Sequence, residues 1–187
     1  MLPEPIETQR LRIRSFLNAD WPNVHAYTSD PVVTTYLPEG VMTEEQTRQF
    51  IAESTTEDAR AYAVELRAEQ RLIGHINFHP WFSPHIYEIG WVFHPEYQGQ
   101  GYATEAAAAL LRYGFESLRI HRVIATCQPQ NVPSYRVMEK LGMQREAHFR
   151  KCIYRDESTW WDEYLYALLE EEWFKSESDA AANLGQQ

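Results

Sequence analysis

The sequence predicts a single domain of mixed α/β structure, in which a strongly twisted sheet with some parallel pairing is flanked by helices. Three extended segments follow one another between residues 61 and 93, separated by polar or proline-bearing turns. A helix, a strand and a second helix then follow between residues 102 and 141, and this order demands some parallel pairing. The chain has 187 residues, 44% of them hydrophobic, which is enough for one core. We place the domain at residues 6–174 and expect residues 175–187 to form a disordered tail.

The N-terminal part begins with a strand and two helices. The alternation of apolar and basic residues in RLRIRSF is typical of a strand with one face on the core. Asn18 is then expected to cap a helix that has Pro22 in its first turn. Thr43 and Gln46 form a capping-box pattern. The polar run from Thr43 to Glu57 therefore predicts a mainly exposed helix, with a possible role as a lid.

The middle of the chain predicts an antiparallel meander and then the helix–strand–helix series. The meander consists of AYAVELRA, RLIGHINFHPW and HIYEIGWVF. In the helix that follows, Ala107, Leu111, Phe115 and Leu118 share one face, and the strand RVIATCQ comes next. Asn131 caps the second helix, whose apolar positions are Tyr135, Met138 and Leu141 and which Gly142 ends. The segments MQREAHFRKCIY and TWWDEYLYALL predict a closing hairpin.

Composition restricts the class of partner and the compartment. The formal net charge of −10 argues against binding to nucleic acid or anionic lipid and fits a cationic or amine-bearing partner better. Cys127 and Cys152 are too few for a disulfide framework, MLPEPIETQR does not resemble a signal peptide, and no apolar run approaches a membrane span. We therefore expect a soluble cytoplasmic protein. His75 and His79 lack any metal-binding motif, so we expect no metal.

The segment HPEYQGQGYATEAAAALLRYGF is the strongest candidate for a ligand site. Gly99 and Gly101 come just before a helix, where curled backbone N–H groups and the positive helix end suit a phosphate, although a simple turn is the alternative. A Walker loop is excluded because Tyr102 and Ala103 follow the second glycine. A Rossmann loop is disfavoured because Thr104 occupies the place of its third glycine.

The segments EIGWVFHPEYQGQGYATEA and NVPSYRVMEKLGM resemble the GNAT superfamily of N-acetyltransferases. The superfamily signature Gln/Arg-x-x-Gly-x-Gly/Ala is met by Gln98, Gly101 and Ala103. The opening IETQRLRIRSF and the closing DEYLYALLEEEW are similar to the branch that contains the Rim-type ribosomal-protein N-terminal acetyltransferases, so the resemblance covers roughly Ile6 to Phe174. It implies acetyl-coenzyme A (acetyl-CoA) as the donor and a GNAT fold with a splayed central strand pair.

The resemblance also implies which residues hold the coenzyme. Backbone N–H groups around the glycine loop would bind the pyrophosphate, and the end of the preceding strand would bond the pantetheine arm. The N–H of Val92 or of Phe93 would polarise the thioester carbonyl. Arg136 and Lys140 could meet the 3′-phosphate, with a solvated helix face as the alternative. The residues expected to contact the coenzyme are Trp91, Val92, Phe93, Gln98, Gly99, Gln100, Gly101, Tyr102, Ala103, Thr104, Asn131 and Ser134.

For the leaving thiolate, the resemblance implies Ser134 as the acid. Spacing alone favours a plain helix cap in which Ser134 bonds only a first-turn amide, and the resemblance reverses this preference. Many superfamily members place a tyrosine acid seven residues after the position of Asn131, where this chain has Met138, so Tyr135 is the reserve acid. Cys127 is not needed as an acyl carrier, because the amine attacks directly.

Glu88 is the candidate base on the strand that leads to Trp91. A cross-strand salt bridge or orientation of the substrate amine is the alternative role. Some relatives carry a glutamate five residues before the asparagine, where this chain has Thr126, so a water relay is a further possibility. Glu105 in the first helical turn is favoured by the helix dipole whatever the function, and we interpret it as structural.

The resemblance predicts a protein or peptide N-terminal α-amine as acceptor. Such an amine is partly neutral near pH 8 and makes light demands on a base. Small amines such as aminoglycosides, polyamines or amino-acid derivatives are the alternative acceptors, and a non-catalytic coenzyme-binding sensor is the alternative class. We expect a monomer or homodimer, with no membrane and no direct nucleic-acid partner.

Overall fold

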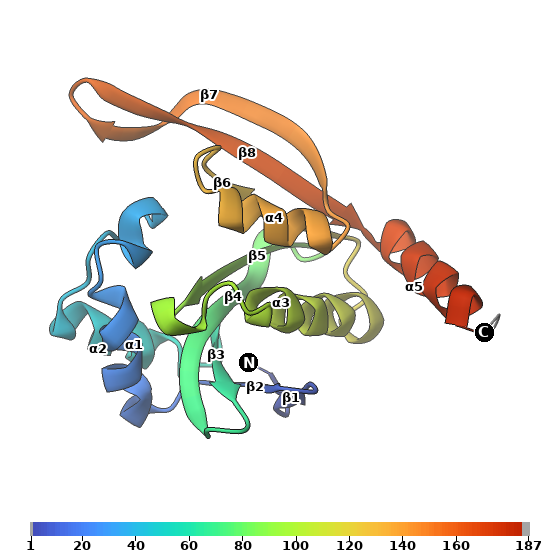
Figure 1. The fold of residues 1–187 in the computed structure, drawn as a ribbon, viewed down its shortest axis with the longest axis horizontal. Helices are drawn as coiled ribbons and strands as arrows, with labels where there is room; N and C mark the ends of the chain where they lie inside the picture. Colours follow the sequence, from blue (N-terminus) through green and yellow to red (C-terminus); the bar gives the residue numbers. More distant parts are fainter. Residues whose placement is uncertain (1, 185–187) are drawn as a thin grey trace. The chain divides into compact units, whose positions relative to one another are not determined.

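The computed structural model describes residues 2–184, which form two compact units (Figure 1). The first unit contains residues 2–79 and 89–110, and the second contains residues 80–88 and 111–184. Strands β4 (Arg71–Ser83) and β5 (Ile86–Phe93) and helix α3 (Tyr102–Arg112) each contribute residues to both units. Among residues 2–184, none of the helices has the length and hydrophobicity needed to cross a bilayer.

The sheet of the first unit has the strand order β1-β2-β3-β4-β5. Strands β1 (Ile6–Glu7), β2 (Leu11–Arg14), β3 (Ala61–Leu66) and β4 pair antiparallel with their sequence neighbours. The strands predicted from RLRIRSF and from the three segments between residues 61 and 93 are therefore confirmed. Leu11 and Ile13 are fully buried, as their alternation with arginines predicts.

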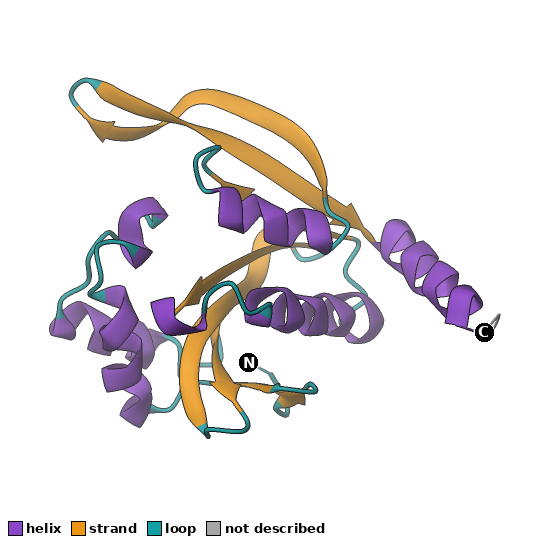
Figure 2. Ribbon diagram, viewed as in Figure 1, coloured by secondary structure: helices purple, strands orange, loops and turns teal. Residues whose placement is uncertain are grey.

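The helices of the first unit are α1 (Trp21–Thr28) and α2 (Glu44–Glu53), which contact each other beside this sheet (Figure 2). The predicted capping box is confirmed, because the Thr43 hydroxyl accepts from Gln46 N at 3.2 Å and Gln46 Oε1 accepts from Thr43 N at 2.8 Å. Most of α2 is exposed, as predicted, while Ile51 is buried in the core. A role for α2 as a lid stays a prediction.

The predicted cap at Asn18 is wrong. A short 3₁₀ helix, η1 (Asn18–Asp20), precedes α1, and the Asp20 carboxylate accepts a hydrogen bond from Leu17 N at 2.8 Å. Asp20 also forms an ion pair with Arg14 at 2.7 Å, so this buried carboxylate has two fixed partners. Asp20 occupies the N-cap position of α1, but its side chain makes no capping bond to α1 and bonds Leu17 ahead of η1 instead.

Helix α3 has the predicted buried face only as far as Phe115. Ala107, Leu111 and Phe115 are fully buried, but Leu118 is 39% exposed. After Arg112 the chain continues as a π-helical turn, η4 (Tyr113–Ser117), and such a wide turn rotates the residues that follow it out of the 3.6-residue register. The prediction that Leu118 shares the buried face is therefore wrong.

The sheet of the second unit has the strand order β5-β6-β8-β7. Residues Ile86–Glu88 of β5 pair parallel with Arg122–Ile124 of β6 (Arg122–Cys127), which confirms the predicted parallel pairing. Strand β8 (Thr159–Leu169) pairs antiparallel with β6 and with β7 (Gln144–Asp156), and β7 and β8 form the predicted closing hairpin. Ile124, Leu165 and Ala167 form an apolar cluster on this sheet.

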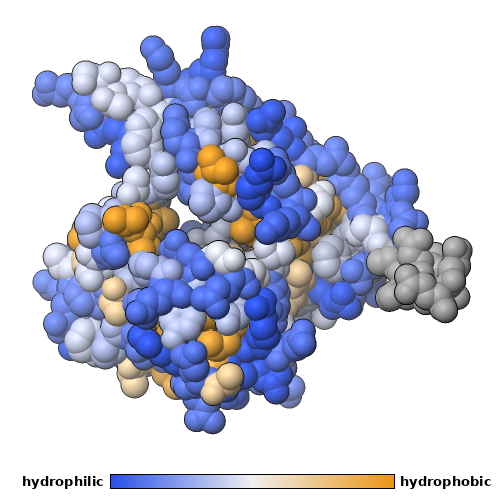
Figure 3. Space-filling view, in the orientation of Figure 1, coloured by the Kyte–Doolittle hydropathy of each residue, from blue (hydrophilic) through white to orange (hydrophobic). Residues whose placement is uncertain are grey.

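The helices of the second unit are α4 (Val132–Lys140), which contacts β6, and α5 (Glu170–Leu184), which follows β8. Phe115 stacks on Trp173 of α5 with ring centroids 5.8 Å apart. Residues 175–184, expected to belong to a disordered tail, are described as part of α5, and residues 185–187 lie outside the described residues. The domain boundary at residue 174 stays a prediction. On the face shown in Figure 3, hydrophilic residues dominate the surface.

Candidate active site

The loop between η3 (Pro95–Tyr97) and α3 has the backbone shape that a phosphate site requires. Gly99 and Gly101 have φ angles of +73° and +81°, in the left-handed region where a side chain is strained. Helix α3 begins at Tyr102, and the N–H of Glu105 bonds the carbonyl of Gly101 at 3.0 Å. The N–H groups of the first turn thus have no intrahelical acceptor and converge at the positive end of the helix. This arrangement suits an anionic ligand.

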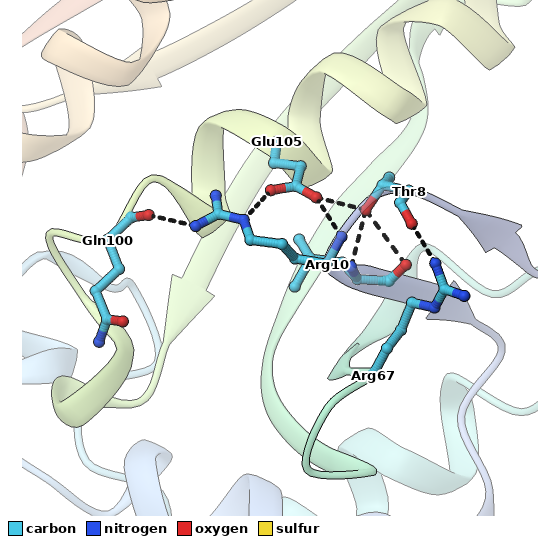
Figure 4. Close-up of polar contacts among 6 residues, drawn as sticks. Thr8, Arg10, Arg67, Gln100 and Glu105 are labelled. Carbon is cyan, nitrogen blue, oxygen red and sulfur yellow. Dashed lines mark hydrogen bonds and ion pairs between the residues drawn. The ribbon is translucent and has the colours of Figure 1, made fainter.

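A set of polar contacts fixes this helix start to the N-terminal strands of the same unit (Figure 4). The Glu105 carboxylate accepts from the Thr8 hydroxyl at 2.6 Å, from Arg10 N at 2.9 Å and from Arg10 Nε at 2.6 Å. The Arg10 guanidinium also donates to the carbonyl of Gln100 at 3.0 Å and lies over the Tyr102 ring at 4.4 Å. Arg10 therefore contacts the residues on both sides of Gly101, which are Gln100 and Tyr102.

The charge of Glu105 is part of this brace. Burial would raise the pKa of Glu105, but the hydrogen bonds from Thr8 and Arg10 and the positive charge of Arg10 lower it. The carboxylate is thereby kept ionised at the helix start, where the dipole also favours a negative charge. We interpret Glu105 as a structural residue. Sequence reasoning missed Thr8 and Arg10, which lie 97 and 95 residues from Glu105.

The end of β5 is tightly packed against the neighbouring β4. Val92 and Phe93 are buried, and Trp91 is partly buried. A Cβ atom on Gly74 would lie 2.5 Å from the carbonyl oxygen of Val92 and 2.7 Å from the Phe93 ring, so only glycine fits there. The Gln98 side chain donates to the carbonyl of Phe93 at 2.9 Å and ties the glycine loop to the strand end. Gly74 is a third residue, after Thr8 and Arg10, that the sequence analysis missed.

The start of α4 carries Ser134 in the second unit. The N–H of Ser134 bonds the carbonyl of Asn131 at 3.0 Å, so Asn131 occupies the predicted N-cap position, but its side chain makes no capping bond. The Ser134 hydroxyl instead lies close enough to the thiol of Cys127 on β6 to lower its pKa. Burial raises the pKa of Cys127 to about 11. The Ser134 hydroxyl acts to lower this pKa, and the charge of Glu163 acts to raise it. Cys127 is thus a protonated thiol near neutral pH.

The side chain of Tyr135 leaves α4 in a different direction from that of Ser134. Its ring packs edge-on against Tyr164 of β8 with centroids 6.2 Å apart, and it lines a groove together with Arg136, Glu139, Met143, Arg145, Tyr164 and Tyr166. Arg136 forms an ion pair with Glu139 at 3.0 Å. The two candidate acids therefore have different neighbours, because adjacent helical residues are about 100° apart around the axis.

Glu88 lies on the sheet of the second unit beside a second glutamate. Glu88 is paired with Ile124, and Thr126 lies two residues along β6 on the same face. Thr126 is paired with Leu165 of β8, and Glu163, two residues before Leu165, shares that face as well. The Thr126 hydroxyl lies close enough to the carboxyl group of Glu163 to lower its pKa. Three strands thus bring two carboxyl groups and a hydroxyl to one face.

The electrostatics of this face are unusual at Glu163. Burial raises the pKa of its carboxyl group above the ordinary value, the Thr126 hydroxyl opposes this shift, and the charge of Glu88 adds to it. Ser134 and its partner Cys127 lie on the opposite face, since Cys127 follows Thr126 directly on β6. Acid and base candidates are thus separated by the sheet of the second unit.

In the first unit, the loop before α3 suits an anionic ligand, and in the second unit, one face of the sheet carries two carboxyl groups. The family model for the GNAT acetyltransferase domain matches residues 10–144. The N-acetyltransferase YnaD of Bacillus subtilis, which carries the description uncharacterised, is 56% identical over 168 residues, covering 90% of this chain and 98% of that protein. The chain therefore belongs to the GNAT family of acetyltransferases and is an acetyl-CoA-dependent N-acetyltransferase.

Solved and curated relatives agree with this assignment. The crystal structure of a GNAT-family acetyltransferase from Bacillus anthracis superposes with a TM-score of 0.86 at 56% identity, covering 90% of this chain and all of that one. The ribosomal protein uS5-alanine N-acetyltransferase of Escherichia coli is 31% identical over 107 residues, covering 56% of this chain and 55% of that protein. The GNAT fold is thus confirmed, and the Rim-type proteins are more distant relatives than YnaD.

Proposed function

We propose that this enzyme acetylates the α-amino group of a protein or peptide N-terminus. The observation that carries the proposal is the anion-binding helix start of the first unit, and the face of the second unit that carries two carboxyl groups supports it. The former suits the pyrophosphate of acetyl-CoA, and the latter suits a cationic amine before it loses its proton. The similarity to an alanine N-acetyltransferase over 107 residues supports the α-amine as the acceptor.

The coenzyme would be held mainly by backbone groups. The N–H groups from Gly99 to Thr104 would bind the pyrophosphate, with Gly101 at the point of closest approach, and Gln98 would act by fixing the loop to Phe93. The end of β5 from Trp91 to Phe93 would bond the pantetheine arm as an added strand, in a splay between strands. The N–H of Val92 or Phe93 would polarise the thioester carbonyl. Asn131 would contribute a further contact from its place before α4.

Proton transfer would use side chains of the second unit. Ser134 would protonate the departing thiolate, with Tyr135 in reserve, and Glu88 belongs to the carboxylate pair that serves the amine. Cys127 would play no covalent part, because its pKa of about 11 keeps the thiol protonated and poorly nucleophilic. Direct attack of the amine on acetyl-CoA fits this arrangement.

The test is release of free thiol from acetyl-CoA in a panel of acceptors. The panel contains peptides that begin with alanine, serine, threonine or methionine, the same peptides with a blocked N-terminus, and small amines including a polyamine and an aminoglycoside. Thiol release that requires a free N-terminus supports the proposal, with mass spectrometry locating the acetyl group. Release with small amines alone would favour the small-molecule alternative. Tight coenzyme binding with no turnover on any acceptor would favour a sensor.

The same proposal covers the compartment, the oligomeric state, the domain boundaries and the partners of the enzyme. We infer a cytoplasmic enzyme, a monomer or homodimer, with its domain at residues 6–174 and with no direct nucleic-acid or membrane partner. The net charge of −10 supports the last point, since a strongly acidic protein is repelled by nucleic acid and anionic lipid. Light scattering coupled to size-exclusion chromatography measures the oligomeric state directly.

A further inference from the structure

Glu163 is a titratable group of the second unit that the sequence analysis did not single out. It lies on β8 diagonally across from Thr126, whose hydroxyl acts to lower its pKa, and it faces the same side as Glu88. Ile124 and Leu165, which are buried, lie between these polar groups on that face. The carboxyl group of Glu163 therefore lies at the border of an apolar cluster, with Thr126 as a polar neighbour.

We propose that Glu163 is the carboxylate that accepts the proton of the acceptor amine, and that Glu88 assists it by holding the positive charge of that amine. The inference rests on the proposed function, because it places the acceptor on the face of Glu88, Thr126 and Glu163. It revises the sequence-based assignment, in which Glu88 alone was the base. Glu163 reaches this face from a strand that pairs with β6 on the side opposite to β5.

Three observations favour Glu163 over Glu88 as the proton acceptor. Glu163 is partly buried, and Thr126 lies diagonally across from it on the same face, so its carboxyl group has a polar neighbour at the border of the apolar cluster. Burial raises the pKa of Glu163, and the charge of Glu88 adds to this effect, so its carboxylate is more basic than that of an ordinary glutamate. A cationic amine bound next to Glu163 would offset the unfavourable effect of the charge of Glu88, which favours the protonated amine.

The proton balance of the reaction is complete with this assignment. The acceptor loses one proton from its ammonium form and a second as its nitrogen bonds the acetyl carbon. Solvent takes the first, Glu163 accepts the second, and the carbon–sulfur bond breaks. The departing thiolate receives a proton on the opposite face, where Ser134 lies, and Glu163 returns its proton to solvent before the next turnover. The attacking amine and the leaving thiolate thus exchange protons with different groups.

The experiment compares Glu163→Gln and Glu88→Gln with the control Glu157→Gln. Glu157 lies exposed in the turn of the same hairpin, so its replacement repeats the chemical change away from this face. We expect Glu163→Gln to lower kcat about 100-fold and to remove the acidic limb of the pH profile of kcat/KM. We expect Glu88→Gln to raise KM for the amine about tenfold with a smaller loss of kcat. Coenzyme affinity by calorimetry should stay within about twofold in all three variants.

The melting temperature of Glu163→Gln distinguishes a catalytic role of Glu163 from a structural one. A glutamate whose pKa is raised by folding destabilises the folded protein above that pKa, because folding must then bury a charge. Above that pH the melting temperature of Glu163→Gln should therefore equal or exceed the wild-type value. A fall in melting temperature together with an unchanged pH profile would overturn the proposal and make Glu163 a structural residue.

Different results would contradict the proposed acceptor class and the proposed role of Glu163. The variants are assayed with whichever amine the wild type acetylates fastest, so loss of the N-terminal acceptor leaves the comparison intact. Wild-type turnover in Glu163→Gln overturns the role of Glu163 and leaves the acceptor untouched. If no amine is acetylated, carbon-13 NMR of labelled glutamate with coenzyme bound decides. Titration of Glu163 like a free glutamate, unchanged in Glu88→Gln, overturns the inference, whereas a raised value that falls in Glu88→Gln supports the coupled pair.

Discussion

The two units carry different kinds of chemistry. In the first unit the predicted coenzyme site consists of backbone, because glycines at residues 99 and 101 and the close approach at Gly74 shape N–H groups and a strand end. In the second unit the predicted proton-transfer groups are side chains, placed by the registers of three strands and the start of α4. The difference teaches that glycine substitutions should damage binding in the first unit, while isosteric polar substitutions should damage turnover in the second.

The largest expected effect is that of Gly101→Val in the first unit. A valine at a φ of +81° is strained by about 1–3 kcal/mol, and its side chain would occupy the space into which the pyrophosphate is expected to fit. We expect coenzyme affinity measured by calorimetry to fall at least about 1,000-fold, or about 4 kcal/mol. The matched control is Gly40→Val, which has a similar φ of +64° in the same unit. Normal coenzyme binding by Gly101→Val would contradict the assignment of the loop.

The next effect concerns acid stability and the buried His75 of the first unit. Burial lowers the pKa of His75 to about 4, while its Nδ1 lies 2.8 Å from the Tyr27 hydroxyl. The unfolded chain therefore binds a proton between about pH 6.5 and pH 4 that the folded chain does not, so stability falls as the pH falls through that window. Relative to His75→Gln, the wild-type free energy of unfolding in urea should fall by up to about 3 kcal/mol. His121→Gln, an exposed histidine of the second unit, should follow the wild type.

Ser134→Ala tests the side-chain chemistry of the second unit. Loss of an acid for the thiolate should lower kcat about 100-fold, or about 2.7 kcal/mol, while coenzyme affinity changes by less than about threefold. Cys127→Ala is the control, because it removes the thiol near the hydroxyl and leaves the hydroxyl in place. Unchanged turnover in Ser134→Ala would move the role to Tyr135, which Tyr135→Phe then examines.

The smallest effect is expected for Gly74→Ala, which reaches the coenzyme site indirectly. The added methyl group would lie 2.5 Å from the Val92 carbonyl, so the end of β5 must move. We expect about a tenfold loss of coenzyme affinity and about 1–3 kcal/mol of stability. Gly90→Ala is the matched control on β5, because a Cβ there would lie 3.8 Å from the side chain of Asn77, an ordinary contact distance. Equal effects of the two substitutions would contradict the special position of Gly74.

Local patterns predicted most of the fold and the backbone part of the site. The capping box at Thr43, the strand alternation at Leu11 and the glycines before α3 depend on residues within a few positions of each other. The π-helical turn after Arg112 lies beyond such reasoning, because the sequence continues a helical pattern through it. Asn131 was placed correctly at the start of α4, but the sequence did not show that its side chain makes no capping bond.

The missed residues act over long distances in the sequence. Arg10 and Glu105 meet only because β2 and the start of α3 belong to the same unit. Glu163 meets Thr126 because β8 pairs with β6 in one particular register, and a shift of one residue would turn its carboxyl group to the other face. Some relatives carry a glutamate at the position of Thr126. In this chain a carboxylate near that position comes from Glu163 on another strand instead.

The alternation of Thr126 and Cys127 along β6 has a consequence for how such an enzyme changes over time. The groups proposed to serve the acceptor and those proposed to serve the leaving thiolate are adjacent in sequence but lie on opposite sides of one strand. With these roles, substitutions on the acceptor side would leave the side chains of the donor side in place. The amine substrate could then change through a few substitutions around Glu88 and Glu163, while the use of acetyl-CoA is retained.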